Sequence, residues 1–220
     1  MQRPNFEFTI PMALEDFIPV IFTAVGLYFL LKVIIRRHRN LCKLACLGAT
    51  LVVTDGFLKA TWKLIYAAAG IDIAWMKDSL FVLMGPGFIF VSWALWRGLK
   101  EKLSTTKQVW LIPLIVVIPS LLLSYYLATT QQGRSWARVL LMLTTIGILF
   151  TNGQIIADSL KRKLYLPIIL LIINITTIFG QAFISQLPQT TALHWLGQIN
   201  NTISWGAFAL AVWLWQKRSL

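Results

Sequence analysis

The sequence has few charged side chains and few residues that bind metals or form disulfides. Only 13% of its 220 residues are Asp, Glu, Lys or Arg, against about a quarter in an average soluble domain. Its two histidines lie far apart in the chain, and its two cysteines, Cys42 and Cys46, are one helical turn apart. We interpret the cysteines as small packing residues, because so few ligands do not make a metal site. This composition argues against a soluble globular protein.

Common catalytic motifs are also missing. The chain has no His/Glu metal motif, no Gly-rich phosphate loop, no serine elbow and no catalytic dicarboxylate motif. We therefore expect no metal and no cofactor. An enzyme is left open only in a metal-free form, with Asp55 and Lys59 as acid and base.

Apolar residues, by contrast, are abundant and form long runs. They make up 57% of the chain, and its mean hydropathy is +0.71. A run of about 20 such residues spans the apolar core of a bilayer. We predict an all-α membrane protein with seven transmembrane helices, at about 16–36, 43–69, 75–97, 108–128, 136–159, 164–187 and 193–216. These spans use nearly the whole chain, so residues 1–220 are expected to form one integral membrane domain, with membrane lipids as partners.

The basic residues predict the orientation of these spans. The net charge is +12, and the connections alternate between strongly and weakly basic. One side carries 14 basic residues, namely Lys32, Arg36, Arg37, Arg39, Lys43, Arg97, Lys100, Lys102, Lys107, Lys161, Arg162, Lys163, Lys217 and Arg218. The other side carries 4, namely Arg3, Lys77, Arg134 and Arg138. The positive-inside rule then predicts an outside N-terminus and a cytoplasmic C-terminus, in a bacterial inner membrane or a plasma membrane. The basic charge is thus a topology signal, and no nucleic-acid partner is expected.

A weak internal repeat indicates how the spans are organised. The matched residues are Thr23, Gly26, Phe29, Ile34 and Ile35 with Thr144, Gly147, Phe150, Ile155 and Ile156 at an offset of 121, Thr54 and Phe57 with Thr176 and Phe179 at 122, and Phe88 and Trp93 with Phe208 and Trp213 at 120. We predict two parallel three-helix repeats, about 16–97 and 136–216, joined by a linker helix at about 108–128. An odd number of helices per repeat requires this extra crossing, because both repeats then have the same orientation.

This layout resembles that of SWEET-type transporters and, more loosely, of opsin-like proteins, which have seven helices. The resemblance covers the whole chain and concerns architecture alone. Pro188 and Gln189 lie in the sixth connection, where the transporter motif would require a span, and residues 193–216 contain no lysine for a retinal Schiff base. No functional residue is therefore carried over from either family.

The second span contains charged residues at a depth where charge is costly. Asp55, Lys59 and Lys63 stand at i, i+4 and i+8 and share one helix face. An unpaired ion inside a span costs at least about 2.5 kcal/mol, so we expect Asp55 and Lys59 to form an ion pair. Two interpretations follow. In the first, the ion pair stabilises the helix bundle and Lys63 reaches the outer membrane–water interface. In the second, the three residues line a cavity that is open to the outside.

Polar residues in the sixth and seventh spans support the cavity. At the offset of 122, Thr177, Gln181 and Ser185 correspond to the three charged residues, and the cavity is expected between the second, third, sixth and seventh spans. The predicted ligand-binding residues are Asp55, Lys59, Lys63, Asn174, Thr177, Gln181, Gln198 and Asn201. A helix break or kink is also expected at 85–87, where a proline stands between two glycines.

These features predict a transporter for a small polar or anionic solute. The alternatives are a ligand-sensing or structural seven-helix bundle, and a metal-free lipid-modifying enzyme that reaches its substrate from the outer leaflet. Cytoplasmic connections of about ten residues or fewer leave little surface for a signalling partner. A homo-oligomer is compatible with the sequence.

Overall fold

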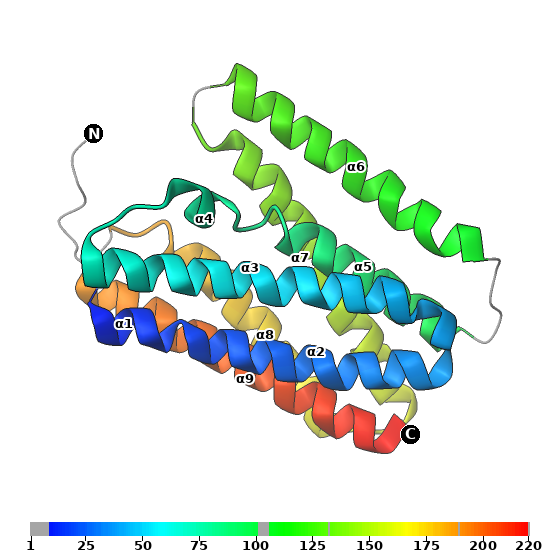
Figure 1. Ribbon diagram of the computed structural model, residues 1–220. Coiled ribbons are helices and arrows are strands. Elements are labelled where there is room, and N and C mark those ends of the chain that lie inside the picture. Colours follow the sequence, from blue (N-terminus) through cyan, green and yellow to red (C-terminus); the bar gives the residue numbers. More distant parts are fainter. Residues whose placement is uncertain (1–8, 101–105, 132, 189, 220) are drawn as a thin grey trace.

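The computed structural model describes residues 9–100, 106–131, 133–188 and 190–219, and within these ranges the chain is helical without a strand. The helices are α1 (Ile10–Glu15), α2 (Phe17–Arg37), η1 (Arg39–Leu41), α3 (Cys42–Ala69), α4 (Ala74–Asp78), α5 (Met84–Leu99), α6 (Thr106–Thr130), α7 (Ser135–Lys161), α8 (Tyr165–Ile184) and α9 (Thr191–Ser219). The long helices lie alongside one another in an elongated bundle (Figure 1). The predicted all-α class is confirmed.

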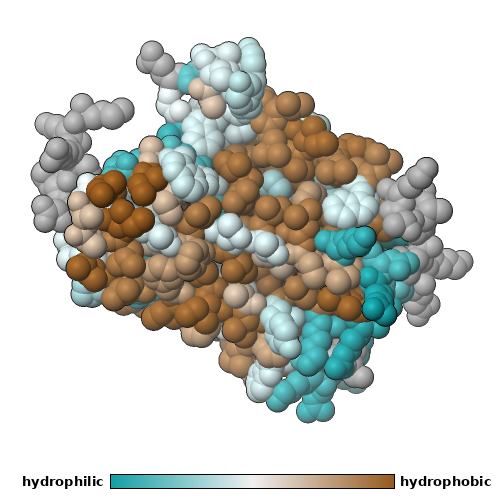
Figure 2. Space-filling model, viewed as in Figure 1, coloured by the Kyte–Doolittle hydropathy of each residue, from teal (hydrophilic) through white to brown (hydrophobic). Residues whose placement is uncertain are grey.

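Five helical stretches are long and apolar enough to cross a membrane, at 10–37, 39–69, 109–130, 135–161 and 165–184. Of the other two long helices, α5 has only 16 residues and α9 begins with a half rich in amides and hydroxyls. Large apolar side chains are exposed along the outside, among them Ile115, Leu122 and Met142, and apolar residues dominate the face in Figure 2. Such a surface is compatible with an integral membrane protein, because lipid covers it without the cost of hydrating it.

The third predicted span, 75–97, is not one continuous helix. Helix α4 ends at Asp78 and α5 begins at Met84, and Phe81 between them has a positive φ of 72°, which a bulky side chain rarely adopts. The expected interruption thus occurs just before residues 85–87, which form the first turn of α5. Pro86 is tolerated there because the first N–H groups of a helix have no partner within it.

The helices pack in a reciprocal pattern. Helix α2 packs on α3 and α9, while α7 packs on α8 and α5; α3 also packs on α5, and α8 on α9. A Cβ atom added at Gly26 of α2 would lie 2.7 Å from the Phe208 ring of α9, and one added at Gly147 of α7 would lie 2.7 Å from Cβ of Phe88 on α5. Both close contacts therefore depend on glycine. Helix α6 lies at the edge of the bundle (Figure 1).

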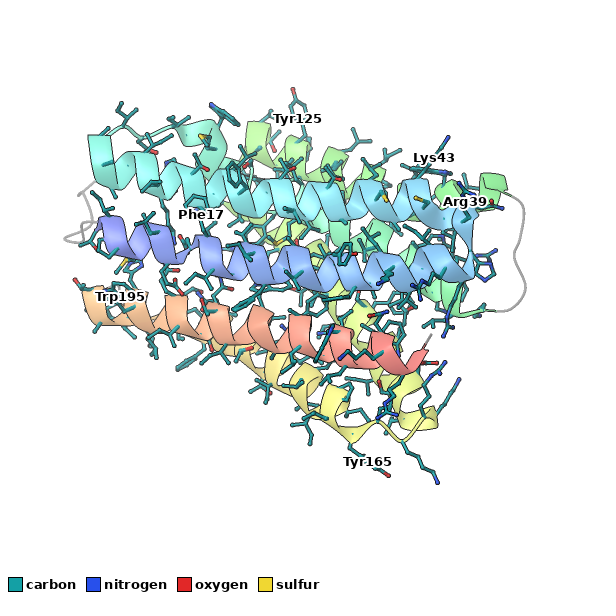
Figure 3. The ribbon with its side chains drawn as sticks, turned by 60° about the horizontal axis from the view of Figure 1, so that its bottom comes forward. Phe17, Arg39, Lys43, Tyr125, Tyr165 and Trp195 are labelled. Carbon is teal, nitrogen blue, oxygen red and sulfur yellow. The ribbon has the colours of Figure 1, made fainter. Side chains whose placement is uncertain are left out.

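Basic residues gather at one end of the bundle, which we call the basic end. It comprises the last turns of α2, α7 and α9, which carry Arg36, Arg37, Lys161, Lys217 and Arg218, and the hydrophilic cluster in Figure 2 marks it. Figure 3 labels Arg39 and Lys43 at this end and Phe17 and Trp195 at the opposite end. Two of the basic residues counted above, Arg3 and Lys102, lie outside the described residues.

Candidate functional site

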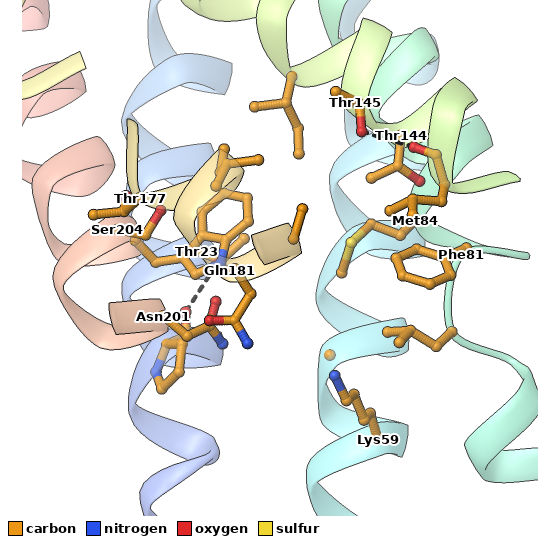
Figure 4. A pocket seen from close by; sticks show the side chains of 18 of the residues that line it. Thr23, Lys59, Phe81, Met84, Thr144, Thr145, Thr177, Gln181, Asn201 and Ser204 are labelled. Atoms are coloured by element: carbon orange, nitrogen blue, oxygen red, sulfur yellow. Dashed lines mark hydrogen bonds between the residues drawn. The ribbon is translucent and has the colours of Figure 1, made fainter. Parts of the chain in front are cut away.

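A cavity of about 510 Å³ lies in the half of the bundle away from the basic end. Its wall comes from the first part of α2 and α7, the second part of α3 and α8, the middle of α9, and the segment 80–84 that leads into α5 (Figure 4). The sequence predicted a cavity between the second, third, sixth and seventh spans, which correspond to α3, α5, α8 and α9. Helices α2 and α7 complete the wall.

Four of the eight predicted ligand-binding residues line this cavity, namely Lys59, Thr177, Gln181 and Asn201. The Lys59 ammonium points into the space, and Gln181 and Asn201 lie on the opposite wall (Figure 4). Asp16 is the other charged residue among the described lining residues, and it forms an ion pair with Lys63. Lys59, in contrast, forms no ion pair within 4.0 Å among the described residues.

Asp55 is fully buried and does not belong to the lining. Neither of its carboxyl oxygens has a hydrogen-bond partner in the described part of the chain. The expected ion pair with Lys59 is therefore not formed. Residues at i and i+4 differ by about 40° around a helix axis, and Asp55 is enclosed by protein whereas Lys59 extends into the cavity. Attraction between the two charges persists through space.

The amides Asn174 and Gln198 also lie outside the lining and hold helices together. Asn174 Nδ2 donates to the Ser204 carbonyl oxygen at 2.8 Å, and Asn174 Oδ1 accepts from Asn152 Nδ2 at 2.7 Å. Gln198 Nε2 donates to the Met12 carbonyl oxygen at 3.3 Å. Such amides are a usual means of joining membrane helices. The ligand role predicted for these two residues therefore has no support from their position.

The cavity is closed toward the basic end. Trp205 forms part of the lining and stacks on Phe88, with ring centroids 5.7 Å apart. The Asn152, Asn174 and Ser204 hydrogen bonds join α7, α8 and α9 beside this stack. Aromatic rings and a network of hydrogen bonds between α7, α8 and α9 thus form the floor.

Polar lining residues also come from positions that the sequence did not single out for binding. Thr23 and Thr144 line the cavity from α2 and α7, and each hydroxyl donates to its own helix, to Pro19 O at 2.7 Å and Leu140 O at 2.8 Å. Their oxygens can still accept a hydrogen bond from a ligand. The signal was present, because these two threonines are matched in the repeat at an offset of 121.

The cavity opens to the surface of the bundle between α7 and α8. Those described lining residues that are exposed lie on these helices or directly after α8, and they are Leu141, Phe179, Ala182, Ser185 and Gln186. The lining residues of α2, α3, α5 and α9 are buried or half-buried. The opening therefore lies beside α7 and α8 and extends from the level of Phe179 to the end of α8.

No family model, curated protein or solved structure matches this chain. Among the described residues, no group of three or more His, Cys, Asp or Glu side chains is placed to hold a metal ion. A functional assignment consequently depends on the cavity and its surroundings.

Proposed function

We propose that the chain is an integral membrane protein with seven transmembrane helices, built from two three-helix units of the same orientation. The units are α2 to α5 and α7 to α9, and α6 is the linker. The reciprocal packing supports this proposal, because the first helix of each unit packs on the third helix of the other. The contacts of Gly26 with Phe208 and of Gly147 with Phe88 join residues that are matched in the repeat.

The cavity wall supports the same twofold relation. Many lining residues occur in pairs at the repeat offsets, namely Thr23 with Thr144, Gly56 with Ile178, Lys59 with Gln181, Ala60 with Ala182, and Met84 with Ser204. Equivalent residues face each other across a cavity when it lies on the axis that relates the units. On this proposal α5 and α9 cross the membrane with the other five helices, and the basic end is cytoplasmic.

The function we propose is transport of a small solute with one negative charge. The observation that carries this proposal is the Lys59 ammonium in a cavity between apolar helices, without an ion-pair partner among the described residues. An ammonium in such a place requires a counter-charge or water. A solute carboxylate supplies that charge, and Gln181 and Asn201 on the opposite wall can hydrogen-bond its polar groups. One lysine matches one negative charge, since Asp16 and Lys63 neutralise each other.

Transport is favoured over the alternatives by two features. A cavity closed at one end and placed between two equivalent units suits alternating access, in which the units rock around a fixed binding site. A metal-free enzyme would need Asp55 and Lys59 to face one substrate, and Asp55 does not reach the cavity. A ligand sensor would use the same cavity without moving the solute.

Charge movement in reconstituted membranes tests the proposal. Proteoliposomes adsorbed on a solid-supported membrane are exposed to a jump in butanoate concentration, with neutral butanamide as the control solute. We expect a butanoate-dependent current that is lost in Lys59→Met and retained in Lys161→Met, which removes an exposed lysine at the basic end. Binding of butanoate without current would indicate the sensor, and a current unchanged in Lys59→Met would contradict the site.

A further inference from the structure

We infer that the solute is an anionic amphiphile with a single apolar chain, and that it enters the cavity from the membrane through the gap between α7 and α8. This inference deepens the proposed function and rests on it. It specifies where the solute comes from: the molecule that carries the carboxylate is dissolved in the membrane and not in water.

The first argument is the position of the gap. Leu141 of α7 and Phe179 of α8 line the cavity and are also 43% and 54% exposed. Both are apolar, and they stand on the surface that faces lipid in the proposed membrane protein. A molecule in the bilayer can therefore pass from lipid to the cavity between the apolar side chains of Leu141 and Phe179, while the polar Ser185 and Gln186 border the opening only beyond the end of α8.

The second argument is that the equivalent position in the other unit is closed. Gly56 allows α3 to approach α2, since a Cβ there would lie 3.0 Å from Cγ2 of Val20, and the rings of Phe17 and Phe57 meet edge to face at 5.8 Å. In the second unit Ile178 stands where Gly56 stands in the first. The branched side chain occupies the space that glycine leaves free, so α7 and α8 stay apart at this level.

The third argument is the division of the wall into a polar and an apolar part. Lys59, Gln181 and Asn201 offer a cation and amides at the level of the gap (Figure 4). Much of the remaining wall is apolar, and it includes Val52, Leu80, Phe81, Met84, Ile148 and Ile178. A short hydrophilic anion leaves this apolar surface hydrated, whereas an acyl chain buries it at a gain of roughly 25 cal/mol per Å². The wall thus fits a carboxylate head with an apolar chain.

Photolabelling distinguishes a membrane-dissolved carboxylate from a water-soluble one. The full chain is reconstituted in phosphatidylcholine nanodiscs and labelled with dodecanoate or butanoate, each carrying a diazirine on its carbon chain. The measured quantity is the labelling of α7 and α8 that excess unlabelled carboxylate removes, read by peptide mass spectrometry. Ala182→Trp narrows the gap. Its control is Ile172→Trp, which lies on the exposed face of the same helix and outside the cavity lining. Lys59→Met removes the cation of the site.

We expect dodecanoate to bind at least about tenfold more tightly than butanoate. Ala182→Trp should slow dodecanoate labelling about tenfold, because it narrows the path of entry, and leave butanoate labelling within about twofold, which also shows that the variant is folded, while Ile172→Trp should change neither. Equal affinities for the two probes and no effect of Ala182→Trp would contradict the inference of an amphiphilic solute, but would not contradict the proposed anion site at Lys59. Labelling that excess carboxylate does not remove, or that is unchanged in Lys59→Met, would overturn the amphiphile and the proposed function together.

Discussion

Asp55 and Lys59 lie one helical turn apart on α3, in different surroundings. The Asp55 carboxyl is enclosed by protein with no hydrogen-bond partner among the described residues. The Lys59 ammonium reaches a cavity in which water or a ligand can solvate it. Their charges attract each other without contact. We therefore expect that removing Lys59 affects the stability of the protein more than removing the charge of Asp55.

A double-mutant cycle measures this dependence. Lys59→Met removes a nearby cation from a buried carboxylate, and we expect it to lower the free energy of unfolding by about 1–2 kcal/mol. Asp55→Asn leaves Lys59 facing the cavity, so its cost should stay within about 0.5 kcal/mol, and the double variant should resemble Asp55→Asn alone. The measurement is thermal or denaturant unfolding in detergent micelles. Losses that simply add in the double variant would show that the two charges are independent.

At the scale of the helix, two close contacts between the two proposed units each depend on a glycine. A Cβ at Gly147 would meet backbone atoms of α5, namely C of Phe88 at 2.9 Å and N of Ile89 at 3.1 Å. A Cβ at Gly26 would first meet the ring of Phe208 at 2.7 Å, and the Ala209 Cα atom lies further away at 3.2 Å. A ring can turn aside more easily than a helix backbone can move, so the two sites should not tolerate a methyl group equally.

Alanine substitutions at these glycines test the packing. We expect Gly147→Ala to destabilise the protein by about 2–3 kcal/mol and Gly26→Ala by about 1–2 kcal/mol, because overpacking forces side chains or backbone to shift. Gly153→Ala is the control on the same helix as Gly147. No atom lies within 4 Å of a Cβ at that position, and alanine in a helix is favoured over glycine by roughly 0.5–1 kcal/mol. Melting temperatures that fall equally in all three variants would contradict these contacts.

At the scale of the molecule, the uneven charge of the two ends bears on orientation. Arg162 donates to the Arg218 carbonyl oxygen at 3.1 Å, so the end of α7 and the end of α9 meet at the basic end. The opposite end contains acidic residues that are paired, among them Asp16 with Lys63 and Asp78 with Arg134. Basic residues are thus more numerous at the basic end, and the positive-inside rule associates the more basic side with the cytoplasm.

A reporter fused after Leu220 tests the orientation. We expect activity of a reporter that functions in the cytoplasm and no activity of one that requires export, because 14 basic residues flank the spans on this side and 4 on the other. The paired control is the same pair of reporters placed before Met1, which should give the reverse result. Export of the C-terminal reporter would place the half of the bundle that contains the cavity toward the cytoplasm.

The sequence alone determined the helical class and, apart from the third predicted span, the approximate positions of the long helices, because runs of apolar residues decide both locally. It also indicated that polar residues of α3, α8 and α9 turn inward, since their spacing follows the helical period. It did not determine which of them reach the cavity. Lys59 and Gln181 do, while Asp55 and Asn174 are enclosed in contacts with other helices.

The tertiary structure decided the rest, because the remaining features depend on how each helix is rotated and how far it stands from its neighbours. The exact place of the expected break, at Phe81, the floor made by Trp205 and Phe88, and the contribution of Thr23 and Thr144 follow from such packing. So does the opening, since the exposed residues of the cavity wall lie on α7 and at the end of α8, whereas α3 approaches α2 closely at Gly56. Distances between helices are not encoded in the period of any single helix.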